Sequence, residues 1–445
     1  MKKEVLFLLI FTILLSMSCK ENEEKKQAQP PVAEKIKKEL TIHGDTRVDN
    51  YYWIRERENP KVIDYLNAEN SYTDSMMAHT KDFQTNLFDE IVGRIKKDDS
   101  SVPYKRNGYF YYTRYQEGGE YPIYCRKKEN MDAAEEIMLN VNEMAKGYSY
   151  YQVVGARVSE DNKILAYGVD TVSRRKYTIH FKDLTTGELL PDKISITTGG
   201  TTWANNNKTV YYSTKDPETL RSDKIFRHTL GTEQADDKLV FEEKDETFGT
   251  FVYKTKSKKY LMLGSYSTLS TEYQYASADE TNPEFTIIQP REKDLEYSVS
   301  HFEDKFYIRT NLDAKNFRLM ETSVNNTGKE NWKEIIPNRD DVLLEGIDIF
   351  KNYLVLSERK NGLNELRIIN QTDKSEYYLD FGEEAYTAYT STNLEFDTEI
   401  LRYGYTSMTT PSSTFDYSMV TKEKTLLKMQ EVLGEFNHEN YEGKR

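Results

Sequence analysis

The chain has 445 residues, enough for two or three domains or one large repeat domain with an ample core, so a small disulfide-stapled protein is excluded. Its 61 Lys and Arg against 74 Asp and Glu give a formal net charge of −13, which repels phosphate backbones, and we expect no nucleic-acid partner. The acidic balance favours cationic ligands or peptides, although many soluble proteins carry a similar charge only for solubility. The six histidines show no zinc-ligand spacing, and we expect neither a metal nor a cofactor.

The first nineteen residues have the architecture of an export signal. Lys2 and Lys3 precede an apolar run from Val5 to Leu15 that only Thr12 interrupts. As a helix this run would span roughly 16 Å, well short of the ~30 Å hydrocarbon core of a bilayer. The sequence therefore favours a signal peptide over 1–19 rather than a permanent transmembrane helix.

The end of this signal resembles a bacterial lipoprotein cleavage box and predicts lipid attachment at Cys19. Ser16 stands three residues before the cysteine, one place after the aliphatic Leu15, and this looser box with its acidic tract at 20–24 is similar to those of Bacteroidetes lipoproteins. The resemblance implies a lipid-anchored protein in the cell envelope of a Gram-negative bacterium, in the outer membrane on its periplasmic or surface face. The alternative is an ordinary secreted protein that loses Cys19 with its signal.

The segment after the signal is polar and offers little to bury. We expect residues 20–38 to form a disordered tether between the membrane and the first domain. If Cys19 is acylated, Cys125 has no partner for an intramolecular disulfide. Cys125 ends the probable strand 121–125, and we interpret it as a buried, inert thiol rather than a nucleophile.

Two helices are predicted next. Asn59 can cap a helix and Pro60 suits a first helical position, and apolar residues between Phe83 and Ile95 follow the spacing of an amphipathic helix. We therefore predict helices over about 60–78 and 81–97, within an N-terminal helical segment at 39–104. Two helices alone supply too little core to be stable, so their apolar faces need a partner surface.

From Asn107 onward, short strands rich in Tyr, Val and Ile alternate with turn residues, and the period is 45 to 50 residues. Such a period is typical of a β-propeller, in which four short antiparallel strands make one blade. The sequence therefore predicts a mainly β fold, a seven-bladed β-propeller at 105–422, preceded by a short α-helical segment and followed by a linker at 423–445. Its units begin near Asn107, Gln152, Thr201, Thr247, Tyr297, Val342 and Ala388.

Two histidines and two acidic pairs within these units could have functional roles, and a structural interpretation is favoured for each. His180 and His228 fall at similar places in adjacent units, but no carboxylate or third imidazole recurs in step with them. We interpret both as structural strand histidines. The paired acids Asp236-Asp237 and Asp340-Asp341 lie in turn-like contexts, and we interpret them as solvated loop carboxylates.

The sequence lacks the usual motifs of hydrolytic and nucleotide chemistry. Segment 263–267 has no second glycine for a nucleophile elbow and lies in a strand pattern. Segment 438–442 begins like a zinc-protease helix but has no second histidine, and loop 198–202 has neither the lysine nor the spacing of a phosphate-binding loop. Residue chemistry alone thus predicts a non-catalytic, exported propeller without catalytic, cofactor-binding or metal-binding residues.

Motifs near both ends of the chain change this interpretation. The first runs from His43 to Arg55 and continues through Asn59-Pro60 and 66–70. Further motifs lie at 108–112, 121–126, 405–413 and 431–437. Together they resemble the prolyl oligopeptidase family of serine peptidases, and most closely its oligopeptidase B branch.

The resemblance implies that residues 39–100 pack on a peptidase domain and that about 105–420 form a lid that admits only short peptides. Family members carry Ser, Asp and His on an α/β-hydrolase domain after the propeller, and we expect that domain to be absent from this chain. No triad residue, and no acidic pocket for Arg or Lys, can then be assigned to it. Without a partner domain, residues 60–97 should be mobile and rich in exposed apolar surface.

Our leading hypothesis is the N-terminal and propeller portion of an oligopeptidase B-like serine endopeptidase that hydrolyses short peptides after Arg or Lys. This portion would gate substrate access and be inactive alone. Its partners would be the hydrolase domain, short peptides and the membrane, through its lipid. The alternative is a self-sufficient, non-catalytic propeller lipoprotein that binds peptide or protein.

Overall fold

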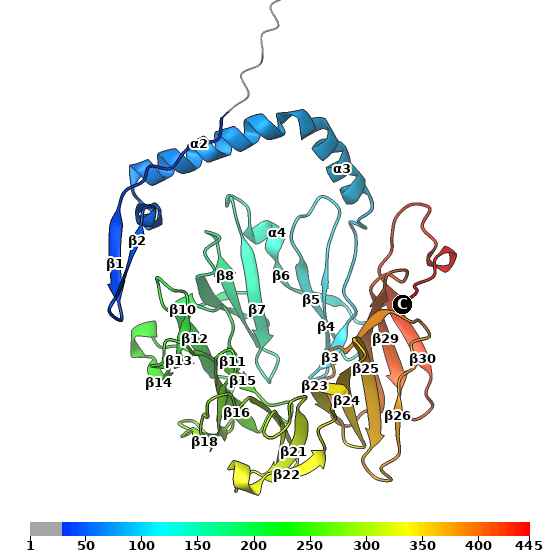
Figure 1. Ribbon diagram of the computed structural model, residues 1–445. Helices are drawn as coiled ribbons and strands as arrows, with labels where there is room; N and C mark the ends of the chain where they lie inside the picture. The colour runs from blue at the N-terminus through cyan, green and yellow to red at the C-terminus, as the bar shows by residue number, and fades with distance from the viewer. Residues whose placement is uncertain (1–28) are drawn as a thin grey trace, which may run out of the picture. The chain divides into compact units, whose positions relative to one another are not determined.

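The structure is a computed structural model, and it describes residues 29–445 (Figure 1). The predicted signal peptide, its Cys19 and the start of the predicted tether lie outside the described residues. The chain divides into two compact units, the first ending at Arg94 and the second spanning Ile95–Arg445. None of the helices within 29–445 is long and apolar enough to cross a membrane.

The first unit combines a hairpin with two helices. Strands β1 (Lys38–Ile42) and β2 (Asp45–Asp49) pair antiparallel, with Leu40 opposite Arg47. The short 3-10 helix η1 (Tyr52–Arg55) follows. Helices α2 (Pro60–Met77) and α3 (Lys81–Gly93) are joined by η2 (Ala78–Thr80).

The chain before β1 is held to this unit. Trp53 Nε1 donates to the carbonyl of Glu34 at 2.9 Å, and the Glu34 carboxylate pairs with Lys61 at 3.0 Å. The amide of Ile36 donates to the carbonyl of Asn50 at 2.9 Å. The prediction of a disordered tether as far as residue 38 is therefore wrong from Glu34 onward, because these bonds order the segment.

The two predicted helices are confirmed. The Asn59 side chain accepts a hydrogen bond from the amide of Lys61 at 3.0 Å, and Pro60 is the first helical residue. Helix α3 ends at Gly93 rather than at 97, because glycine is a poor helix former and the amide of Arg94 closes a tighter turn on Ile91.

The exposed apolar surface predicted for these helices is also present. Phe83 and Phe88 of α3 are 66% and 65% exposed, and Leu66 and Ile91 are exposed as well. Their spacing places them along one side of each helix, as an amphipathic pattern requires. The mobility predicted for 60–97 stays a prediction.

The second unit is a β-propeller built of antiparallel sheets, which follow one another in chain order around a common centre (Figure 1). Five sheets have four strands, each formed by four consecutive strands. The first contains β3 (Tyr104–Arg106), β4 (Tyr109–Arg114), β5 (Ile123–Lys128) and β6 (Glu135–Asn140). The second of these four-stranded sheets contains β15 (Gly249–Lys254), β16 (Tyr260–Tyr266), β17 (Thr271–Ser277) and β18 (Thr286–Gln289).

The remaining three of these sheets lie in the second half of the chain. One contains β19 (Tyr297–Phe302), β20 (Lys305–Thr310), β21 (Arg318–Ser323) and β22 (Lys333–Ile336). Another contains β23 (Val342–Ile349), β24 (Tyr353–Lys360), β25 (Leu363–Asn370) and β26 (Glu376–Tyr378). The last contains β27 (Tyr386–Thr390), β28 (Ile400–Ser407), β29 (Ser413–Ser418) and β30 (Lys424–Met429).

The sheet from residues 152–242 departs from the predicted pattern. Eight strands form one sheet here, because β10 and β12 pair at Thr197 and Thr214. The prediction of seven separate four-stranded blades is therefore corrected to five four-stranded sheets and one of eight strands. The eight are β7 (Gln152–Val158), β8 (Ile164–Asp170), β9 (Tyr177–Asp183), β10 (Leu189–Thr197), β11 (Thr202–Trp203), β12 (Thr209–Lys215), β13 (Ser222–Thr229) and β14 (Lys238–Glu242).

Short helices interrupt the loops of this unit. They are α4 (Val141–Met144), η3 (Gln234–Asp236), η4 (Lys329–Asn331) and η5 (His438–Asn440).

Apolar contacts between successive sheets form the core. One cluster joins Val355 and Leu366 of the β23–β26 sheet to Leu401 and Tyr403 of the β27–β30 sheet, all essentially buried. Strands buried on both faces read as nearly continuous apolar runs, as in Leu354–Leu356 of β24. Each sheet is therefore stabilised by its neighbours, which fits a repeat architecture.

A glycine facing an aromatic ring recurs in this core. Gly264 of β16 lies opposite Phe251 of β15, and Gly404 of β28 lies opposite Tyr389 of β27. A Cβ atom at either glycine would overlap the facing ring. Gly264 and Ser265 thus lie inside strand β16, as the sequence pattern predicted, and not at the strand-to-helix turn of a nucleophile elbow.

We expect Gly264→Ala to lower the free energy of unfolding of the second unit by about 1–3 kcal/mol, because Phe251 must move to accept the methyl group. Denaturant unfolding measures the change. Gly346→Ala is the control, since its Cβ would lie 3.8 Å from Ser357 in ordinary contact. Equal destabilisation by both substitutions would contradict the prediction.

Candidate functional site

The structure assigns packing roles to several residues that the sequence singled out. Cys125 in β5 is fully buried, as predicted, and burial raises the pKa of its thiol to about 11. His180 and His228 both lie in strands, as predicted. Asp340 and Asp341 are exposed, as predicted for loop carboxylates. Within 29–445, no group of three or more His, Cys, Asp or Glu residues could hold a metal ion.

His228 is nevertheless more than a lone strand histidine. Its ring is fully buried, with Nδ1 2.7 Å from Asp237 and Nε2 3.1 Å from Asp192. Asp237 also accepts from the Tyr212 hydroxyl at 2.7 Å, so its prediction as a solvated loop carboxylate is wrong. Burial alone would lower the pKa of His228, but the hydrogen bonds and charges of Asp237 and Asp192 outweigh burial and raise it. This cluster is a buried hydrogen-bonded cross-link within the eight-stranded sheet.

One serine and histidine pair occurs among the described residues. His301 Nδ1 lies 2.8 Å from Ser257 Oγ, while the buried Nε2 has no hydrogen-bond partner within 29–445. Burial lowers the pKa of His301 to about 4, so the ring is neutral at pH 7. Ser257 Oγ also lies 2.8 Å from Thr255 Oγ1. Because no carboxylate orients the imidazole, the pair lacks the third member of a catalytic triad.

The second unit contains a central cavity of about 1160 Å³. Strands β3, β7, β15 and β23, each the first of its sheet in chain order, line it together with β11 and with segment 391–397 after β27. Its charged side chains are Arg106, Arg157, Glu160, Lys254, Lys256, Lys258, Asp348, Glu395 and Asp397. A wall that carries this many charged side chains among apolar ones suits a passage or site for a charged ligand.

Glu160 is the centre of one charge cluster in this wall. Its carboxylate lies 3.0 Å from Arg106, 2.6 Å from Lys254 and 3.2 Å from Lys258. Burial alone would raise the pKa of the Glu160 carboxyl, but the hydrogen bonds from Lys254 and Asn107 and the nearby cations lower it to about 2. Glu160 is therefore ionised at every physiological pH, and it links three separate segments of the wall.

Lys256 and Asp348 form a second charge pair. Their atoms lie 2.9 Å apart, and Lys256 Nζ also donates to the carbonyl of Ile349 at 2.8 Å. Burial lowers the pKa of Lys256 and raises the pKa of Asp348, so desolvation weakens the charge on both partners. The sequence prediction did not identify this charged wall, although lysines alternate at 254, 256 and 258, from the last residue of β15 into the turn before β16.

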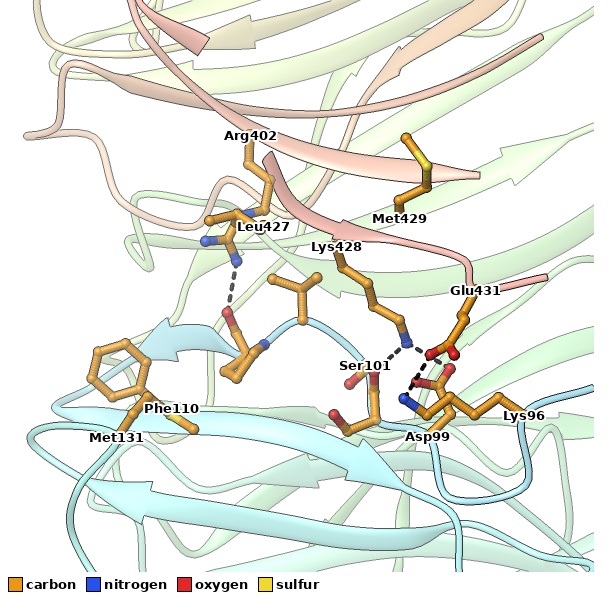
Figure 2. A pocket seen from close by; sticks show the side chains of 13 residues that line it. Lys96, Asp99, Ser101, Phe110, Met131, Arg402, Leu427, Lys428, Met429 and Glu431 are labelled. Atoms are coloured by element: carbon orange, nitrogen blue, oxygen red, sulfur yellow. Dashed lines mark hydrogen bonds and ion pairs between the residues drawn. The ribbon is translucent and has the colours of Figure 1, made fainter. Parts of the chain in front are cut away.

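A smaller cavity of about 510 Å³ lies where the first sheet meets the last, and Figure 2 shows its lining side chains. Arg402 of β28 donates to the carbonyl of Pro103 at 2.7 Å, and Lys428 of β30 pairs with Asp99 at 2.6 Å. Lys96 pairs with Glu431 at 2.9 Å. Charged contacts between segments about 300 positions apart therefore connect the two ends of the propeller.

We expect Arg402→Ala to destabilise this junction by about 2 kcal/mol, since Arg402 also forms a bidentate pair with Asp416 at 2.7 and 3.0 Å. Denaturant unfolding followed by tyrosine fluorescence measures the loss. Lys96→Ala is the comparison, and its effect should be much smaller because the Lys96 pair is solvent-exposed. A larger loss in Lys96→Ala than in Arg402→Ala would contradict this ranking.

Comparisons with known proteins account for this architecture. The family described as "Prolyl oligopeptidase, N-terminal beta-propeller domain" matches residues 30–430. The chain belongs to this family. Prolyl oligopeptidases are serine peptidases, and this propeller is of the oligopeptidase B type, which confirms the family predicted from the sequence motifs.

Two curated proteins and one solved structure that are similar to this chain are peptidases. The chain is 40% identical to dipeptidyl aminopeptidase BI of Pseudoxanthomonas mexicana and 31% identical to Protease 2 of Moraxella lacunata, over 97% and 92% of this chain. Oligopeptidase B from Leishmania major has a similar structure, with a TM-score of 0.86 and 30% identity over 93% of this chain. The chain spans 62%, 60% and 62% of the lengths of these three proteins.

Proposed function

We propose that this chain confines short peptides for a serine endopeptidase of the oligopeptidase B type. The observation that carries the proposal is the central cavity of about 1160 Å³, which is lined by the first strands of several propeller sheets. Pockets for drug-sized ligands measure about 300–1,000 Å³, so this cavity suits a peptide of a few residues and is far too small for a folded protein.

We propose that the chemistry belongs to a C-terminal α/β-hydrolase domain, as the family resemblance implies. There a serine would attack the peptide carbonyl with histidine as general base, and cleavage would follow Arg or Lys. The 445 residues would not hydrolyse peptides by themselves. Support comes from Ser257 and His301, whose contact lacks an orienting carboxylate.

The eight-stranded sheet would act as two adjacent blades, so that seven units surround the cavity. Support comes from its core, where Phe181 of β9 packs edge-on against Trp203 of β11 at 6.1 Å and Ile179 belongs to the same cluster as Val210. Side chains of two halves that pack face to face cannot belong to one flat sheet. The first strands of both halves, β7 and β11, line the cavity as the first strands of other sheets do.

We also propose that Cys19 carries a lipid that anchors the protein in the cell envelope of a Gram-negative bacterium. Support comes from the sequence of residues 1–24. Metabolic labelling with tritiated palmitate should mark the wild-type protein and leave Cys19→Ser unlabelled. Equal labelling of both proteins, or of neither, would contradict the anchor.

A chimera tests the confining role. The C-terminal part of the Pseudoxanthomonas mexicana relative that this chain does not match is joined to the full chain and compared with that part alone. We expect the chimera to cleave a short peptide containing Arg or Lys and to leave a folded protein substrate intact. A chimera that cleaves both substrates as readily as the C-terminal part alone would refute confinement.

A further inference from the structure

Three cationic side chains of the central cavity share a single carboxylate, and a fourth cation, Arg157, lines the same cavity. Arg106, Lys254 and Lys258 share Glu160 at 3.0, 2.6 and 3.2 Å. Within residues 29–445, no other carboxylate lies within ion-pair distance of these three, and Arg157 has no carboxylate partner at that distance. The cluster around Glu160 therefore carries a net charge of about +2, to which Arg157 adds a further positive charge in the same cavity, in a protein whose overall charge is −13.

The other acids of the cavity are already engaged elsewhere. Asp348 pairs with Lys256 at 2.9 Å, and Asp397 pairs with Lys351 at 3.1 Å. The charge of Glu395 acts on Lys256 as well. None of them offsets the excess positive charge around Glu160.

This excess lies in a poorly solvated place. The side chains of Lys254 and Glu160 are only 10% and 13% exposed. Burial lowers the pKa of Lys254, and the neighbouring charges of Arg106 and Lys258 lower it further. Like charges at low solvation repel one another strongly, and an additional anion relieves that repulsion.

We propose that this part of the cavity is an anion site in which Arg106, Arg157 and Lys258 bind the C-terminal carboxylate of a short peptide. The proposal rests on the proposed function, because it names the end of the peptide that the cavity would hold. Guanidinium groups bind carboxylates in bidentate geometry, and Lys258 adds a mobile charge since its side chain is 45% exposed. Thr201 lines the same cavity with a hydroxyl that makes no hydrogen bond within the described residues.

Calorimetric titration of the full chain at low ionic strength tests the site. The probes are trialanine as the free acid, trialanine amide and inorganic phosphate, since phosphate shares the chemistry of a carboxylate. We expect the free acid to bind at least about tenfold more tightly than the amide, the usual value of a charge-assisted contact. Added salt should weaken binding of the acid.

Variants locate the binding. Arg157→Gln and Lys258→Gln should each weaken binding of the free acid by about tenfold. Lys259→Gln is the matched control, because it removes the same charge one residue away from Lys258 and does not line the cavity. Circular dichroism confirms that each variant is folded.

Three results would overturn the proposal. The first is equal binding, or no binding, of the acid and the amide. The second is binding of phosphate without binding of the acid, which would assign the site to free phosphate. The third is an equal effect of Lys258→Gln and Lys259→Gln. The size selectivity of the chimera is measured separately, so confinement can hold even where this site fails.

Discussion

Replacing His228 with alanine lowers the free energy of unfolding of the second unit by about 3–5 kcal/mol, the usual cost of removing one partner from a buried ion pair. The substitution leaves Asp192 and Asp237 buried without the imidazole that lies between them. It also removes a ring that stacks on Phe181 at 5.9 Å. Urea unfolding monitored by circular dichroism measures the loss.

His180→Ala is the matched control for this prediction. His180 occupies the corresponding strand β9, stacks on Tyr167 at 5.7 Å and has no carboxylate partner in the described part of the chain. Its removal should cost about 1 kcal/mol, as for an ordinary partly buried side chain. Similar losses of unfolding free energy in the two variants would show that the contacts of His228 with Asp192 and Asp237 contribute nothing to stability.

The contribution of His228 should depend on pH in one direction. Because its folded pKa is raised, the stabilisation is fully present below the ordinary histidine pKa of about 6.5 and is lost as the pH rises through the folded value. The difference in unfolding free energy between the wild type and His228→Ala should therefore shrink from acidic to alkaline pH. If this difference in unfolding free energy grew with pH, it would contradict a raised pKa of His228 in the folded protein.

Glu160→Gln has the second largest expected effect, a loss of about 3 kcal/mol at pH 7. The carboxyl pKa falls from 4.5 to about 2 on folding, and the variant leaves Arg106, Lys254 and Lys258 without a carboxylate. Because the folded pKa is depressed, this stabilisation is present above about pH 4.5 and disappears as the pH falls through 2. Unfolding of the two proteins at several pH values measures it.

Glu395→Gln is the control for Glu160→Gln. Glu395 lines the same cavity and is exposed, so its substitution should change stability by less than about 0.5 kcal/mol. Glu160→Gln should also tighten binding of trialanine, because it removes the only negative charge of the anion site. If Glu160→Gln proved as stable as Glu395→Gln, the prediction that the Glu160 carboxylate stabilises the folded protein would be wrong.

Local signals predicted most of the fold. Asn59 and Pro60 fixed the start of α2, because capping and proline geometry act within a few residues. The predicted unit starts at Gln152, Tyr297 and Val342 coincide with the first residues of β7, β19 and β23, because alternation and turn residues recur in every unit.

The sites were hidden from the sequence because their members meet only through packing of the sheets. Glu160 is 94 positions from Lys254, and His228 is 36 positions from Asp192. Nothing local distinguishes Asp237 from Asp340, since both lie in acidic pairs near turns. The pairing of β10 with β12 depends on a single pair of residues and has no sequence signal of its own.

Peptide hydrolysis by the full 445-residue chain tests the central claim most directly. The assay uses a fluorogenic peptide with Arg or Lys before the cleavable bond, together with labelling by a fluorophosphonate that modifies reactive serines. The account predicts no turnover and no label, and an identical result for Ser257→Ala. Turnover that the phosphonate abolishes, or that Ser257→Ala removes, would show that the chain contains its own hydrolytic centre and would contradict the account.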